Sequence, residues 1–270
     1  MQFNDTPLGK KSLYIDQYAP HLLCPIPRKH KRDEIGVSTP LPFFGFDCWN
    51  AYEISWLNKK GKPVIATATL VFPIDNHFLI ESKSLKLYFN SFNQTSFENE
   101  QAVLDCIQKD LSKATQSHVD VKLNDHAIRQ MTPLNSDCLD EQDITIDCYT
   151  PNPHLLKIKN TVIVTETVHS HLLKSNCLVT GQPDWGSIEI TYTGQTMDRA
   201  QLLRYLIGFR QHHEFHEQCV ERIFMDIQAY CKPIELTVYA RYTRRGGLDI
   251  NPYRSTSPIF HVKNNRLYRQ

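Results

Sequence analysis

The chain has 270 residues and a formal net charge of +1, with 41% hydrophobic and 22% charged residues. These values are typical of a soluble globular protein with one large domain or two of ordinary size. A charge so close to zero argues against a polyanionic partner, so we expect no direct contact with nucleic acid. No segment reaches the roughly 18 apolar residues of a membrane helix, and the N-terminus lacks the apolar core of a signal peptide. We therefore expect a cytoplasmic protein that does not bind membranes.

The first predicted segment, residues 1–48, is rich in proline, lysine and loop residues, and we expect it to form an irregular N-terminal arm. Its basic run PRKHKR at 27–32 is followed by acidic residues, which favours a solvated surface loop over a nucleic-acid patch. Two strands are expected next, at 51–57 and 63–73. Apolar and β-branched residues dominate both, and NKKGK supplies a turn between them.

A helix is expected at 98–114, because apolar residues recur there at helical spacing. A short strand is expected at 118–123. The segment 125–158 holds many Asp, Asn, Pro and Thr residues and is typical of a connection. In the second half, strands are expected at 187–193 and 233–247, and helices are expected between them at 198–211 and 214–231.

Each half thus shows strands, then helices, then a strand. This repeated order predicts an α+β fold built from two modules of one type, each with helices packed on an antiparallel sheet. The expected boundaries are an arm at 1–48, an N-terminal module at 49–135, a connection at 136–158 and a C-terminal module at 159–270.

The eight cysteines are expected to be reduced thiols in a cytoplasmic protein. No two are spaced as C-x-x-C, which disfavours a structural zinc site. Cys177, in NCLVTGQPD, has polar neighbours and precedes a turn, so it lies in a loop, where reactive groups tend to occur. It could be a nucleophile or only a small buried side chain. A nearby carboxylate raises the pKa of a thiol, so Asp184 makes sense as a proton shuttle rather than as an activator.

Three further stretches could bind ligands. In QHHEFHEQ, His212 and His216 have helical metal spacing, but the zinc-protease motif fails. His216 and Glu217 could instead face a pocket, where the carboxylate would accept two N–H groups of a heterocycle. ESKSLKLY could be a capped helix start or a phosphate contact through Lys83. RRGG at 244–247 could bind phosphate or be only a turn at a strand end. A nicotinamide cofactor would bind without a Rossmann domain, since no G-x-G-x-x-G is present.

Four stretches together resemble the NADPH-dependent nitrile reductases of queuosine biosynthesis, a tRNA-modification pathway. They are ESKSLKLYFNSFNQT, NCLVTGQPDWGSIEI, FRQHHEFHEQCVERI and YTRRGGLDINPYRS. The resemblance covers most of the chain and is closest to the long, bimodular branch. Those enzymes convert 7-cyano-7-deazaguanine to its aminomethyl derivative. The resemblance implies the tunnelling fold, in which modules assemble into barrels, and it implies a homodimer.

The resemblance also implies roles for individual residues. Cys177 would attack the nitrile carbon to form a covalent thioimide, and Asp184 would act as the general acid. The implied substrate contacts are Ile80, Glu81, Ser82, Phe215, His216 and Glu217. The implied NADPH contacts are Ser82, Lys83, Arg245 and Gly246. Two NADPH would be consumed for each product, and no metal is expected. The alternatives are a zinc-dependent purine or pterin cyclohydrolase of the same fold and a non-catalytic purine-binding protein.

Overall fold

A computed structural model describes residues 13–260 and 262–270 of the protein. The start of the expected N-terminal arm therefore lies outside the described residues. The five α-helices of the described chain are α1 Lys29–Glu34, α2 Ser82–Asn90, α3 Glu100–Thr115, α4 Arg199–Ile207 and α5 His216–Cys231. Single 3₁₀ turns lie at Pro20–Leu22, Ala127–Arg129, Pro153–Leu155 and Gly208–Gln211.

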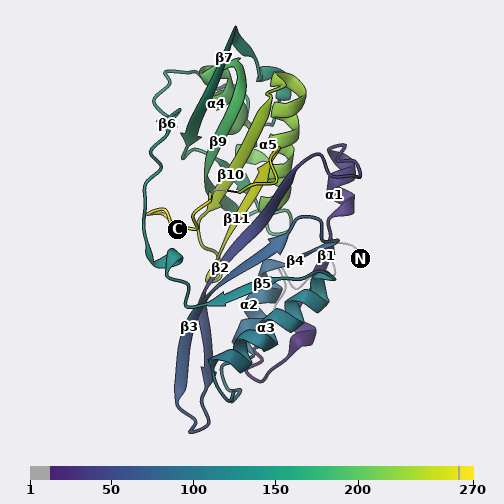
Figure 1. Ribbon diagram of the computed structural model, residues 1–270, viewed down its shortest axis with the longest axis vertical. Coiled ribbons are helices and arrows are strands. Elements are labelled where there is room, and N and C mark those ends of the chain that lie inside the picture. The colour runs from purple at the N-terminus through teal and green to yellow at the C-terminus, as the bar shows by residue number, and fades with distance from the viewer. Residues whose placement is uncertain (1–12, 261) are drawn as a thin grey trace.

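Nine strands of the described chain form one sheet. They are β2 Phe44–Leu57, β3 Pro63–Pro73, β5 Asp120–Leu123, β6 Asp137–Cys138, β7 Ile158–Ser170, β8 Lys174–Asn176, β9 Pro183–Met197, β10 Glu235–Tyr242 and β11 Leu248–Ser255. Their order is β5-β3-β2-β11-β10-β9-β7-β6, and β8 pairs separately with β9. Only the short pair β6–β7 is parallel, so the predicted α+β class with antiparallel pairing is confirmed (Figure 1).

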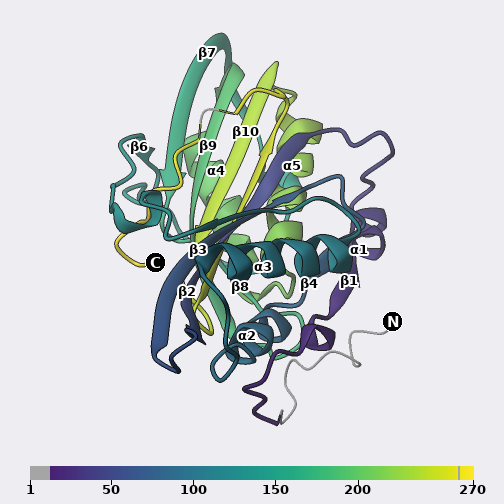
Figure 2. The same cartoon turned by 60° about the horizontal axis from the view of Figure 1, so that its bottom comes forward.

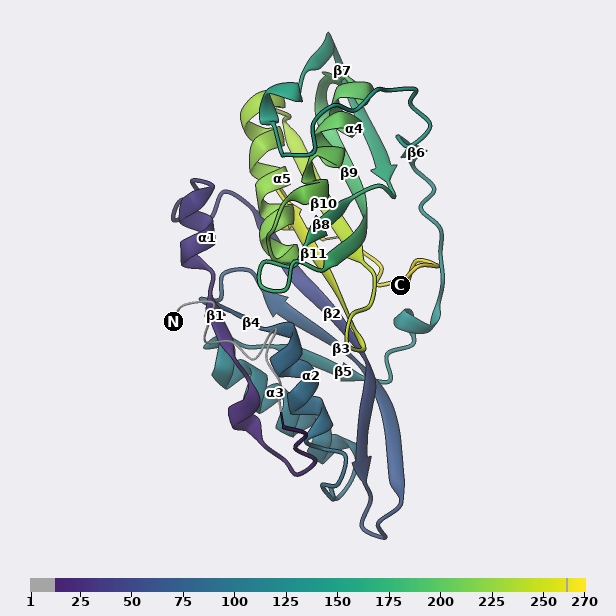
Figure 3. The ribbon, with the colours of Figure 1, turned by 180° about the vertical axis from the view of Figure 1, so that it is seen from behind.

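The helices form two groups on this sheet, and each group has its own hydrophobic cluster. Helices α2 and α3 contribute Leu85 and Ile107 to a cluster with residues of β2, β3 and β5. Helix α5 contributes Ile223 to a second cluster that includes Ile190 of β9. Figure 3 shows α4 and α5 lying against the strands of the C-terminal half. The apolar stripe predicted for the last helix is therefore the surface that packs on the sheet.

A single strand pair joins the two halves of the molecule. Strand β2, from the N-terminal half, pairs with β11, from the end of the chain, in a register that places Cys48 opposite Asn251. The strands of both halves therefore lie side by side in one twisted sheet (Figure 2). The joint brings the segment after β4 (Phe78–Ile80) close to the loops of the C-terminal half, which is where the candidate site lies.

The basic run at 27–32 is not the solvated loop that we predicted. It contains the start of α1, and both Arg28 and Arg32 are buried. Arg28 donates to Asp47 at 2.6 Å, and Arg32 donates to Glu221 at 2.7 Å. The prediction was wrong because these carboxylates are distant in the sequence, and a charged side chain is buried only where such partners exist. The arm is also less irregular than expected, since β1 (Pro25–Pro27) pairs with β4 and β2 already begins at Phe44.

Most predicted elements are confirmed, and two long strands were missed. The strand at 63–73 has the predicted bounds, and the helices predicted near 98–114 and 214–231 are α3 and α5. We did not predict β7 or β11. Every residue of β11 is buried, so it shows no alternation between polar and apolar residues, and its Pro252 argues against a strand by pattern alone.

Candidate active site

A small cavity lies between the two halves of the chain. It is lined by Ile26, Trp49, Leu79, Ile80, Ser82, Cys177, Phe215, His216, Glu217, Arg245 and Ile250. Its volume is about 10 Å³, which is roughly the space of one water molecule. A heterocyclic ligand can therefore enter only if some of these side chains move. Six of the residues predicted for the site line this one cavity together with Cys177, although they come from opposite halves of the sequence.

Cys177 lies in the loop between β8 and β9, as the sequence indicated, but its side chain is buried. The loop is held by two backbone hydrogen bonds: the Cys177 N–H donates to the carbonyl of Gln182 at 2.8 Å, and the Gly181 N–H donates to the carbonyl of Cys177 at 3.0 Å. Burial raises the pKa of the Cys177 thiol, but hydrogen bonds with Thr180 and Arg245 lower it by more, so its pKa is below the ordinary value. A lowered pKa favours the thiolate, which is the nucleophilic form.

Asp184 is the first buried residue of β9, and it is bound by Arg245. The Arg245 guanidinium donates to Asp184 Oδ1 at 2.7 Å, and His216 Nε2 lies 3.6 Å from the same oxygen. The other oxygen, Oδ2, is buried without a hydrogen-bond partner. Burial raises the pKa of Asp184 to about 6, although Arg245 lowers it. The carboxyl can thus carry a proton close to neutral pH, as a proton shuttle must.

His216 and Glu217 begin helix α5 and are both buried. His216 Nε2 and Glu217 Oε1 have no hydrogen-bond partner. Burial, with a smaller effect from Arg245, holds the pKa of His216 well below its usual range, so the ring is neutral. Burial and the negative charge of Asp47 raise the pKa of Glu217. Buried polar atoms are nearly always paired in native proteins, so this pair indicates a place where a polar ligand binds.

Only some of the substrate contacts predicted around ESKSLKLY line the cavity. Ile80 and Ser82 line the cavity. The Glu81 carboxylate instead caps helix α2, accepting from the N–H groups of Lys83 at 2.6 Å and Ser84 at 2.8 Å. A substrate contact through Glu81 would have to share these oxygens with the cap.

The predicted cofactor residues lie around the start of α2 and the turn after β10. Arg245 lines the cavity, whereas Lys83 and Gly246 lie outside it. Gly246 adopts a left-handed conformation, and a Cβ there would lie 3.1 Å from Lys86 Cδ. The cationic side chains here and the bare backbone of Gly246 suit an anionic dinucleotide. Because Glu81 already occupies the first free N–H groups of α2, phosphates would be bound by side chains rather than by the helix end.

Two groups of functional neighbours were missed from the sequence. Trp49, Ile26 and Ile250 form apolar walls of the cavity, and nothing in their local sequence distinguishes them from core residues. Glu214 is buried between His212 and Arg222, which donate to it at 3.0 and 2.8 Å. These bonds fix the segment that leads into His216. Glu214 has both cationic partners close by in the sequence, at His212 and Arg222, and this grouping is a signal that could have been noticed.

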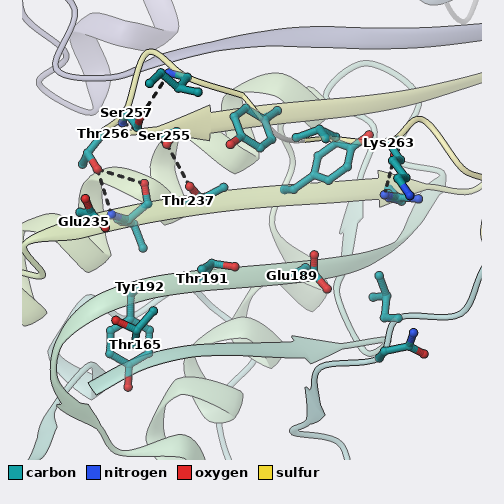
Figure 4. A pocket seen from close by; sticks show the side chains of 18 of the residues that line it. Thr165, Glu189, Thr191, Tyr192, Glu235, Thr237, Ser255, Thr256, Ser257 and Lys263 are labelled. Carbon is teal, nitrogen blue, oxygen red and sulfur yellow. Dashed lines mark hydrogen bonds between the residues drawn. The ribbon is translucent and has the colours of Figure 1, made fainter. Parts of the chain in front are cut away.

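Other parts of the described molecule offer less chemistry. One of two cavities of about 590 Å³ lies on the sheet face away from α4 and α5, and the described residues that line it include no cysteine or histidine (Figure 4). Across 13–260 and 262–270, no group of three His, Cys, Asp or Glu residues is placed to hold a metal ion. All eight cysteines are free thiols. No helix in these ranges is both long and apolar enough to span a membrane.

Comparison with known proteins identifies the family. Residues 14–123 match the family "Nitrile reductase, 7-cyano-7-deazaguanine-reductase N-term", and residues 183–258 match the family "QueF-like protein". Cys177 lies between the two matched regions. A solved structure described as the archaeosine synthase QueF-Like in the apo form is 14% identical, with a TM-score of 0.32, over 38% of this chain and 99% of that chain.

Full-length relatives are much closer. A protein of Coxiella burnetii (strain Dugway 5J108-111) is 56% identical over 97% of this chain and 96% of its own length. A protein of Chromobacterium violaceum is 55% identical over 98% of this chain and 96% of its own length. Both are named NADPH-dependent 7-cyano-7-deazaguanine reductase. The chain therefore belongs to the family of NADPH-dependent 7-cyano-7-deazaguanine reductases.

Proposed function

We propose that the protein reduces the nitrile of 7-cyano-7-deazaguanine to an aminomethyl group with two NADPH, in queuosine biosynthesis, through a covalent thioimide on Cys177. Membership of the family supports the reaction. The observation that supports the covalent route is the arrangement in the cavity. A buried thiol with a lowered pKa lines the same small space as His216 and Glu217, whose polar atoms lack partners.

The first step joins the thiol to the nitrile. The Cys177 sulfur forms a bond to the nitrile carbon, while one π bond of the nitrile breaks and its electron pair takes a proton on nitrogen. Asp184 takes the proton of the thiol and passes it to that nitrogen, so this addition needs no reductant. It converts a poor hydride acceptor into a protonated carbon–nitrogen double bond, which accepts hydride more readily.

Reduction then needs two hydrides, which NADPH supplies when it is bound. The first hydride and a proton convert the thioimide to a hemithioaminal. Loss of the Cys177 thiolate gives an imine, and a second hydride and proton give the amine. Water would hydrolyse the imine to an aldehyde, so the buried cavity with its apolar walls serves to exclude it. Ser82, Lys83, Arg245 and Gly246 are the residues that we propose to contact the cofactor.

Recognition of the base would use the unpaired atoms of helix α5. The Glu217 carboxylate can accept two N–H groups from the edge of a deazaguanine, and such paired hydrogen bonds to a carboxylate are strong and directional. His216 would add a hydrogen bond from Nε2, while Ile80 and Phe215 would pack against the ring.

We further propose that each half of the chain is a module of the tunnelling fold and that the protein is a homodimer. Separate hydrophobic clusters and separate pairs of helices in the two halves support the modules. The hollow sheet face of the C-terminal half supports the dimer. There Thr191 and Glu189 of β9 line a cavity of about 590 Å³, so a second copy can close a barrel around this face (Figure 4).

The proposed reaction can be tested by its two stages. The protein is mixed with 7-cyano-7-deazaguanine without NADPH, and its absorbance is followed. We expect a new thioimide band, which Cys177→Ala abolishes. NADPH is then added, and two NADPH should be oxidised for each amine formed. Cys148→Ala is the matched control, because Cys148 is an exposed thiol that does not line the cavity.

Other outcomes would identify the alternatives. Normal turnover by Cys177→Ala would rule out the covalent route. Stoichiometric zinc and hydrolysis without NADPH would indicate a cyclohydrolase. Tight binding of the base with no band and no turnover would indicate a binding protein.

A further inference from the structure

We propose that Arg245 is a catalytic residue of the thiol addition: it stabilises the Cys177 thiolate and holds one oxygen of Asp184, leaving the other oxygen to carry the proton. This inference rests on the proposed function and deepens it. Family resemblance implied only a cofactor contact for Arg245. The geometry assigns it a second role, in a step that occurs before any hydride is transferred.

The contacts of Arg245 carry the inference. Its guanidinium donates to Asp184 Oδ1 at 2.7 Å, and the interaction with Arg245 is one cause of the lowered pKa of the Cys177 thiol. It lines the cavity beside Cys177, and only 26% of its side chain is exposed. A guanidinium has five N–H donors in a rigid plane, so it can bind two acceptors at fixed positions at once. One cation therefore connects the proposed nucleophile to the proposed acid.

The backbone holds Arg245 firmly in this position. Arg245 and Leu248 exchange backbone hydrogen bonds of 2.8 and 3.1 Å across a two-residue turn between β10 and β11. Gly246 and Gly247 fill the turn, with φ values of +59° and +77°. A turn with two positive φ angles matches the twist of an antiparallel pair and strongly prefers glycine. The guanidinium is thus placed by the sheet rather than by a free loop.

This arrangement resolves a difficulty in the chemistry. A carboxylate next to a thiol opposes thiolate formation, so Asp184 cannot activate Cys177 by its charge. Arg245 supplies the missing positive charge. Because it binds only Oδ1, the buried and unpartnered Oδ2 stays available to receive the thiol proton and pass it to the nitrile nitrogen. The proton moves from sulfur to Asp184 to nitrogen, and Arg245 keeps its charge throughout.

The test measures the thiol without substrate or cofactor. The ultraviolet absorbance of thiolate is titrated against pH in the full protein, with the signal of Cys177→Ala subtracted. In Arg245→Gln, we expect the fraction of Cys177 thiolate at neutral pH to fall about tenfold or more, as a one-unit rise in pKa would produce. Arg245→Lys keeps the charge but cannot bind both acceptors in the same geometry. Its thiolate fraction should therefore lie between those of the parent protein and of Arg245→Gln.

Arg244→Gln is the matched control. Arg244 is the neighbouring arginine, but its guanidinium lies over the Tyr52 ring and donates to the Gln270 carbonyl, outside the cavity. We expect its titration to equal that of the parent protein. If Arg245→Gln does not fold, as judged by circular dichroism, the Arg245→Lys titration tests the inference. A thiolate fraction equal to that of the parent protein would then contradict it.

The rate of thioimide formation without NADPH gives a second measurement. It should fall in Arg245→Gln along with the thiolate fraction. An unchanged titration and an unchanged thioimide rate, with only the KM for NADPH raised, would overturn the inference and leave Arg245 as a cofactor contact. Failure of the proposed function would give a different result from failure of this inference. In that case the parent protein would form no thioimide, while the titration could still show the effect of Arg245 on the Cys177 thiol.

Discussion

Three side chains beside the cavity each bury a polar atom that has no partner. These atoms are Asp184 Oδ2, His216 Nε2 and Glu217 Oε1. An unpaired buried polar group costs about 1–3 kcal/mol. A ligand that pairs them recovers this free energy, whereas an analogue that lacks the matching N–H groups does not. Such a site rejects analogues more strongly than an apolar pocket would. The same atoms therefore explain both the cost of the site and its selectivity.

The pH dependence of thioimide formation should reflect Asp184 directly. The reactive form has an ionised Cys177 and a protonated Asp184, so the pair must hold one proton. At low pH both groups are protonated and no thiolate exists; at high pH neither is protonated and no acid remains. We expect a bell-shaped rate profile with one limb near pH 6, because burial raises the pKa of Asp184 to about 6.

Asp184→Asn provides the check on this profile. It should bind the base but form the thioimide on the order of 10²–10⁴-fold more slowly, because the general acid is lost. It should also lose the limb near pH 6 in single-turnover absorbance measurements. A variant that kept this limb would show that another group is the acid.

Helix α1 and strands β2 and β11 meet at a buried ion-pair network behind Glu217. Glu221 of α5 accepts from Arg254 at 2.9 Å and from Arg32 at 2.7 Å, and Arg28 lies 3.9 Å away. Asp47 is the other carboxylate, so three arginines face two acids. We expect Glu221→Gln to lower the free energy of unfolding by about 3–5 kcal/mol, since it leaves buried cations with one carboxylate.

Urea unfolding measures this change, and Glu34→Gln is the matched control. Glu34 makes the same kind of pair with Lys31, at 2.8 Å, but Glu34 is about half exposed. Its loss should cost at most about 1 kcal/mol. If Glu221→Gln and Glu34→Gln changed the free energy of unfolding equally, the stabilising role that we assign to the buried network would be wrong. Burial raises the pKa of Glu221, but Arg254 and Arg32 lower it by more. Its contribution to stability should therefore be present at neutral pH and be lost in acid.

The sequence predicted elements well where local pattern determines structure, and poorly where distant partners do. The strand at 63–73 shows strong β propensity and has the predicted bounds. Helix α1 is short and highly charged, and its burial depends on Asp47 and Glu221, which no local pattern reveals. Strand β11 lies between two other strands and is buried throughout, which removes the alternation that marks a half-exposed strand.

The candidate site followed the same rule. Family resemblance named Cys177, Asp184 and the α5 residues, and most of them lie around one cavity. The contact of Arg245 with Cys177 and Asp184 could not be predicted, because it joins residues more than 60 positions apart through the pairing of β10 with β9. The sequence indicated a capped helix start in ESKSLKLY, but it did not identify Glu81 as the residue that forms the cap.

At the scale of the whole molecule, the open sheet face gives a test of assembly. Light scattering should give about twice the chain mass of 31.4 kDa. Thr191→Arg places a charged side chain on this face and should shift the protein toward monomer. Asp105→Arg, on the exposed surface of α3, is the control and should leave the dimer intact. A parent protein that is monomeric at micromolar concentration would contradict the proposal.

The pairing of β2 with β11 has a consequence for the synthesis of the protein. The two strands are about 200 residues apart in the chain, and at a synthesis rate of about 5–20 residues per second the ribosome needs roughly 10–40 s to make that length. During this time one edge of β2 has no partner, and unpaired strand edges promote aggregation. Arg245 also emerges late. The nascent chain therefore has Cys177 well before the arginine that activates it, and a truncated product should carry a thiol of ordinary reactivity.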